Sequence, residues 1–137
     1  MKMFRCVVLA ERHYGLRERM RAMLNTTFET VVMVADEASL LESASRLSAE
    51  LAVVDLSLTH GNGIGMIKRL HAHCPEMKMI VISVPDEPSA SKSALAAGTN
   101  GFVLKRAVAS DLLPAVDAVL AGQGYVSPEV LRDQGAE

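Results

Sequence analysis

The chain lacks the features that mark several large classes of protein. Two cysteines among 137 residues are too few for a disulfide framework, and tryptophan is absent. The net charge is −2 with no basic block, so electrostatics gives no support for direct nucleic-acid binding. No apolar run approaches the roughly 18 residues of a membrane-spanning helix, and no signal peptide is recognisable. These absences favour a cytoplasmic protein in which Cys6 and Cys74 stay as free thiols.

What the chain does have is a repeating order of strand and helix patterns. Half of its residues are apolar, which is enough for one sizeable core, and the length fits a single domain. Apolar runs predict strands at 4–10, 31–35, 51–55, 78–83 and 101–105. Helical patterns follow at 14–25, at 37–49, from 64 to a stop at Pro75, at 89–97 and at 110–121. Asp36 and Ser110 are the predicted N-caps of the second and fifth helices.

The predicted strands are apolar almost without interruption. Such runs indicate burial on both faces, and hence a parallel sheet with helices above and below it. We therefore expect an α/β domain of the (βα)5 type over residues 1–124. A short tail at 125–137 follows, with a helical turn near Pro128.

Three of the predicted strands end on polar residues, namely Asp55, Ser83 and Lys105. Ligands of open parallel sheets bind at the carboxyl ends of the strands, so these side chains should converge on one crevice. A carboxylate accepts a phosphoryl group only if the developing charge is neutralised and the oxygens are held in line. Lys105 offers a positive charge and Ser83 a hydroxyl donor. The pattern predicts phosphoryl chemistry on Asp55.

These residues lie in segments that resemble the receiver domain of two-component response regulators. The similarity covers almost the whole chain and is closest to receivers of the NarL/FixJ type, which usually precede a LuxR-type helix-turn-helix. It rests on five segments in order: VLAERH at 8–13, VVDLSL at 53–58, GNG at 61–63, AAGTNGFVLK at 96–105 and AGQGYVSPE at 121–129. The resemblance implies a flavodoxin-like, doubly wound sheet of five parallel strands in the order 2-1-3-4-5.

The resemblance also implies roles for individual residues. Asp55 would be the phosphoacceptor, Ser83 the switch hydroxyl, and Lys105 the charge that bridges to the phosphoryl group. Phe102 stands at the place of the mobile aromatic switch residue, with partial burial at a strand edge as the alternative interpretation. Ser57 would offer its backbone carbonyl to a metal ion.

The chain departs from the family pattern at the acidic pocket. Glu11 and Arg12 stand where the family normally has two adjacent acids that hold Mg²⁺. Glu11, Asp55 and the Ser57 carbonyl remain as candidate ligands, since Mg²⁺ is usually bound by one or two carboxylates with phosphate oxygens and water. Because a guanidinium repels a dication, we predict weak or absent Mg²⁺ binding. Arg12 is expected to pair with Asp55; contact with phosphoryl oxygens and a solvent-facing side chain are the alternatives.

A second group of possible ligands, His71, His73 and Cys74, is not expected to bind a metal. Their spacing does not place all three on one helical face, so a solvated helix end is the preferred interpretation.

We expect a receiver module without enzymatic activity of its own. A histidine kinase or a phosphotransfer protein would donate to Asp55, and the output would be protein contact with a downstream partner. In the family, the surface of the fourth helix, fifth strand and fifth helix often mediates docking, so a homodimer is expected there. One alternative is a phosphorylation-independent interaction module in which Arg12 fixes Asp55. Another is the N-terminal part of a DNA-binding LuxR-type regulator, if the natural chain is longer. A small nucleotide-binding enzyme is disfavoured because no phosphate-cradling loop is present.

Overall fold

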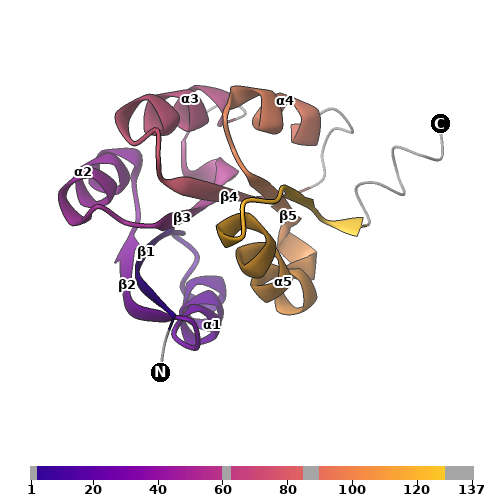
Figure 1. Ribbon diagram of the computed structural model, residues 1–137. Helices are drawn as coiled ribbons and strands as arrows, with labels where there is room; N and C mark the ends of the chain where they lie inside the picture. Colours follow the sequence, from indigo (N-terminus) through magenta and orange to yellow (C-terminus); the bar gives the residue numbers. More distant parts are fainter. Residues whose placement is uncertain (1–2, 60–62, 85–89, 129–137) are drawn as a thin grey trace.

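A computed structural model shows a central parallel sheet with helices on both of its faces (Figure 1). It describes residues 3–59, 63–84 and 90–128. The strands are β1 (Phe4–Ala10), β2 (Phe28–Val34), β3 (Leu51–Asp55), β4 (Lys78–Ser83), β5 (Gly101–Leu104) and β6 (Tyr125–Val126). The helices are α1 (Tyr14–Leu24), α2 (Glu37–Leu47), α3 (Ile64–His73), α4 (Ala90–Ala97) and α5 (Val108–Leu120). The strand order is β2-β1-β3-β4-β5-β6, which confirms the predicted doubly wound α/β fold.

The sheet separates two hydrophobic cores, one under each layer of helices. Successive side chains of a strand point to opposite faces. Val7 and Leu9 of β1 therefore belong to the core beneath α1 and α5, and Val8 and Ala10 to the core beneath α2, α3 and α4. Figure 1 shows the same division of the helices. An uninterrupted apolar strand is stable only because both faces are covered. None of the helices in the described ranges is long and apolar enough to span a bilayer.

One of the two predicted N-caps is confirmed and the other is wrong. The Asp36 carboxylate accepts the backbone N–H of Ser39 at 2.7 Å and opens α2 as expected. Helix α5 begins at Val108, because a 3₁₀ turn at Lys105–Ala107 runs directly into it. Ser110 therefore lies inside the helix, where its hydroxyl donates to the carbonyl of Ala107 at 3.2 Å.

The edge strand β2 begins at Phe28, three residues before its predicted start. Glu29 and Thr30 are exposed, since the strand is paired on one side only and its outer positions face water. Because these residues are polar, the apolar run begins only at Val31 and predicts a strand that is too short.

The C-terminal segment adds a sixth strand that the apolar pattern does not predict. Tyr125 of β6 is level with Gly101 of β5, and Val126 is level with Phe102. A strand of two residues leaves no periodic pattern, so only the neighbouring edge of β5 reveals it. The helical turn expected near Pro128 falls mainly on residues outside the described ranges.

Ser127 holds this segment against the sheet through hydrogen bonds. It is fully buried, its N–H donates to the Phe102 carbonyl at 2.9 Å, and its hydroxyl accepts the Leu104 N–H at 3.1 Å. The same hydroxyl donates to Asp111 Oδ2 at 2.9 Å. Neither Ser127 nor Asp111 had a predicted role.

Replacement of Ser127 by alanine is expected to lower the free energy of unfolding by about 1–2 kcal/mol, because it leaves a buried N–H and a carboxylate oxygen without that partner. Urea denaturation measures the change. The matched control is Ser93→Ala on the exposed side of α4, which should cost less than about 0.5 kcal/mol. Equal effects of the two substitutions would show that the hydrogen bonds of the Ser127 hydroxyl do not stabilise the fold.

Candidate functional site

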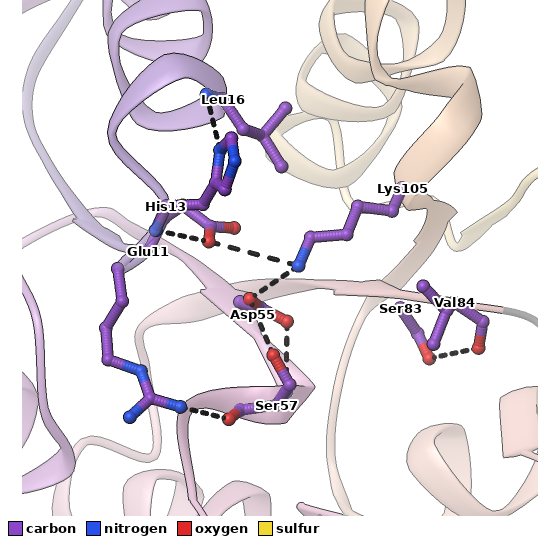
Figure 2. A network of polar contacts seen from close by, with 9 residues as sticks. Glu11, His13, Leu16, Asp55, Ser57, Ser83, Val84 and Lys105 are labelled. Carbon is purple, nitrogen blue, oxygen red and sulfur yellow. Dashed lines mark hydrogen bonds and ion pairs between the residues drawn. The ribbon is translucent and has the colours of Figure 1, made fainter.

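The candidate site lies at the carboxyl edge of the sheet. In the parallel register Ala10 of β1 is level with Val54 of β3. The residue that follows β1 and the residue that closes β3 are therefore neighbours, namely Glu11 and Asp55. Lys105 opens the 3₁₀ turn after β5, and its side chain extends toward this pair (Figure 2).

Asp55 is buried, and three hydrogen bonds hold its carboxylate. Lys105 Nζ donates to Oδ2 at 2.9 Å. The backbone N–H of Ser57 donates to Oδ1, and the Ser57 hydroxyl donates to Oδ2, both at 2.9 Å. The structure thus brings the predicted acid and the predicted amine into direct contact.

Glu11 lies beside this group and is only 1% exposed. Its Oε2 accepts the backbone N–H of His13 at 3.1 Å and lies 3.9 Å from Lys105 Nζ. Its Oε1 has no hydrogen-bond partner among the described residues. Two carboxyl groups therefore share one ammonium group in a largely buried place, and Asp55 has the shorter contact to it.

Burial and hydrogen bonding separate the pKa values of the two carboxyl groups. Burial raises the pKa of Glu11 from 4.5 to about 7; the His13 N–H opposes this rise and the charge of Asp55 adds to it. Burial also acts to raise the pKa of Asp55, but hydrogen bonds from Lys105 and Ser57 outweigh it, so this pKa falls below 3.8. At neutral pH Asp55 is therefore ionised, whereas Glu11 is only partly ionised.

The prediction of an ion pair between Arg12 and Asp55 is wrong, since no such pair is present among the described residues. Arg12 Nη2 instead donates to the backbone carbonyl of Ser57 at 2.8 Å. Glu11 is buried while Arg12 is exposed, as expected for successive residues of an extended chain, which point in opposite directions. The guanidinium consequently lies at the rim, and Lys105 takes the place at the carboxylate.

Ser83 closes β4 as predicted, but its hydroxyl is not bonded to Asp55. Its Oγ donates to the carbonyl of the next residue, Val84, at 2.9 Å. Figure 2 shows this pair well apart from the Asp55 group. Asp55 is level with Ile82 rather than with Ser83, and the local bond already satisfies the hydroxyl. The expected convergence of Ser83 on Asp55 is therefore not present in this conformation.

Phe102 is a core residue in this structure. It is 2% exposed and packs in the core beneath α2, α3 and α4. The alternative of a partly buried strand-edge residue is wrong, because β6 pairs with β5 along the edge that would have exposed it. A switch role for Phe102 remains a prediction.

The residues present do not fit a resident Mg²⁺ ion. Glu11 and Asp55 supply two carboxylates, but the Ser57 carbonyl is already bonded to Arg12. Two unit charges about 4 Å apart interact by roughly 4 kcal/mol at an effective dielectric near 20, and a dication doubles this repulsion against a guanidinium. Across residues 3–59, 63–84 and 90–128, no group of three or more His, Cys, Asp or Glu side chains could hold a metal ion.

Comparison with known proteins identifies the family. Residues 7–117 match the response regulator receiver domain. The chain belongs to this family. A putative transcriptional regulator of Pseudomonas aeruginosa is 32% identical over 127 residues, which are 92% of this chain and 61% of that protein. The chain spans 53% to 61% of the length of the first curated relatives.

Solved receiver structures agree with the fold of this receiver domain. A LuxR-family two-component response regulator from Aurantimonas sp. SI85-9A1 has a TM-score of 0.84 over 97% of this chain and 98% of that one. At 21% identity, that likeness concerns the fold alone. RcsB from Salmonella enterica serovar Typhimurium, bound to a promoter in the presence of phosphomimetic BeF3−, has a TM-score of 0.79 at 28% identity. That match covers 93% of this chain and 64% of RcsB.

His13 lies beside this site, and no role was predicted for it beyond its place in the matching segment at 8–13. It accepts the N–H of Leu16 through Nδ1 at 3.3 Å, so it caps α1, while its own N–H bonds to Glu11. Its place directly before the first helical pattern was the available signal. His13 therefore ties the start of α1 to the buried acid.

Proposed function

We propose that this receiver domain accepts a phosphoryl group on Asp55 from a histidine kinase or a phosphotransfer protein. The contact of 2.9 Å between Lys105 Nζ and Asp55 Oδ2 carries this proposal, since it sets a positive charge beside an ionised carboxylate. An Asp55 oxygen forms a bond to phosphorus while the donor's own bond to phosphorus breaks. The leaving group keeps the electron pair of that bond and takes up a proton. Lys105 then offsets the charge of the acyl phosphate.

The output in this proposal is contact with a downstream protein or a second copy of the chain in the cytoplasm. The surface of α4, β5 and α5 is the proposed docking face, and β6 forms part of it because it extends the sheet beyond β5. Leu95 of α4 is exposed there. In a longer natural chain the same change would act on an attached DNA-binding domain, a possibility that the promoter-bound relative supports.

A second candidate is an interaction module that works without phosphorylation. The bond of Arg12 to Ser57 and the three hydrogen bonds to Asp55 favour it, because they hold the pocket in one arrangement without a phosphoryl group. The Ser83 hydroxyl, turned to Val84, also fits such a fixed state.

Intact-mass measurement after incubation with a small phosphodonor separates the two candidates. The wild-type chain is expected to gain the mass of one phosphoryl group, and Asp55→Asn is expected to gain none. Asp117→Asn is the matched control, since Asp117 is an exposed aspartate of α5, and it should gain as the wild type does. Each protein is incubated once with Mg²⁺ and once with EDTA. A wild-type chain unmodified in both conditions would reject Asp55 as phosphoacceptor and leave the second candidate.

A further inference from the structure

Arg12 joins two loops at the rim of the pocket. It directly follows Glu11 after β1, and its guanidinium bonds to the carbonyl of Ser57 after β3, a residue 45 positions away. Two cationic side chains therefore lie at this pocket: Arg12 on the Ser57 carbonyl and Lys105 on Asp55.

Ser57 connects this guanidinium to the carboxylate. Its carbonyl accepts from Arg12, while its N–H and its hydroxyl both donate to Asp55. All three polar groups of Ser57 are therefore engaged. A cation that used the Ser57 carbonyl together with Asp55 would share that oxygen with the Arg12 guanidinium and would be repelled by its charge.

The pocket already holds two basic side chains. Lys105 lies near both Glu11 and Asp55, and Arg12 is bonded to Ser57, which in turn donates to Asp55. Mg²⁺ is usually bound by one or two carboxylates together with phosphate oxygens and water, and here both carboxyl groups already lie near the ammonium group of Lys105.

We propose that Arg12 is the resident cation of this pocket: its guanidinium, held on the Ser57 carbonyl, takes the place of a divalent metal ion. The site thereby works without Mg²⁺. This inference rests on the proposed function only in taking Asp55 as the centre of the pocket.

Metal titration of the purified chain tests the inference. Mn²⁺ is the probe, with free ion followed by its paramagnetic resonance signal, and Mg²⁺ is tested as a competitor. Wild type is expected to show no saturable binding up to about 10 mM, an order of magnitude beyond the weakest protein sites for hard cations. Arg12→Asp is expected to bind one ion at least about tenfold more tightly than wild type, with Mg²⁺ displacing the probe.

Two further variants separate the causes. Arg12→Ala removes the blocking guanidinium without adding an acid, so it should bind more tightly than wild type and more weakly than Arg12→Asp. Arg19→Asp makes the same change of charge at an exposed position of α1 and should behave as wild type.

Two results would overturn the inference. One is saturable binding by the wild-type chain below about 10 mM, and the other is an absence of binding in both Arg12 variants while their circular dichroism stays native. Neither depends on phosphorylation. A chain that gains phosphate on Asp55 but fails this titration keeps its proposed function and loses only the role of Arg12.

Discussion

Lys105→Met is expected to lower the free energy of unfolding by about 3 kcal/mol at pH 8 and by distinctly less at pH 5. Lys105 is the ammonium group that contacts Asp55 and lies beside Glu11. Without it, two buried carboxyl groups lose the cation that lowers their pKa values, so the folded-state pKa of both is expected to rise. An acid whose pKa is higher in the folded state costs stability as pH rises above its unfolded pKa. The destabilisation therefore grows from pH 5 to pH 8.

Urea denaturation of wild type and variant at both pH values measures this effect. Lys68→Met on the exposed side of α3 is the matched control and should change stability by less than about 0.5 kcal/mol. In a Glu11→Gln background the same Lys105→Met change should cost less, since only one carboxylate then loses its partner. A cost that is equal at both pH values would point to lost packing rather than to charge.

The stability of the wild-type chain is expected to fall by up to about 3 kcal/mol between pH 5 and pH 8, and Glu11→Gln should abolish most of that fall. Glu11 has a pKa of about 7 in the folded chain against 4.5 when unfolded. Between these values the unfolded chain has released a proton that the folded chain still holds. Stability therefore decreases with rising pH in this window, and the decrease is complete above pH 7.

Other groups with shifted pKa values affect stability outside the range from pH 5 to pH 8. The pKa values of Asp36, Glu37 and Asp55 are lowered, so their contributions are present above pH 5 and are lost only in acid. The raised pKa of Cys6 acts above pH 9. Glu42→Gln, an exposed position of α2, is the control and should leave the slope between pH 5 and pH 8 as in wild type. A wild-type curve without a slope in this window would contradict the protonation of Glu11.

Most of the scaffold could be predicted because each strand carries its own signal. In β3 and β4 every residue but the first of β4 is buried, and an apolar run of that kind, bounded by polar residues, is typical of a strand covered on both faces. The exceptions are the edges. Half of β2 faces water and β6 has two residues, so neither shows an apolar run over its full length. Their places were decided by backbone hydrogen bonds to a neighbouring strand.

Within the site, prediction succeeded where the chain path alone determines position. Asp55 is the last residue of β3, and Lys105 is the first residue after β5. Parallel strands end at the same edge of the sheet, so this acid and this amine come into contact although they are 50 positions apart in the chain. For the remaining side chains of the site, the order of residues does not specify which of the nearby acceptors receives the hydrogen bond. Arg12 bonds to a carbonyl rather than a carboxylate, and Ser83 bonds to its neighbour Val84.

Residue types and their order along the chain are enough to establish the alternation of strands and helices, the family, and the acid and amine at the strand ends. The distribution of charge in the pocket depends instead on how the folded chain brings distant segments together. Three features depend on distances between segments far apart in the chain. They are the burial of Glu11, the ion pair of Lys105 with Asp55, and the hydrogen bond from Arg12 to Ser57. The strength of electrostatic interactions depends on such distances and on the exclusion of water, and neither can be calculated from the order of residues.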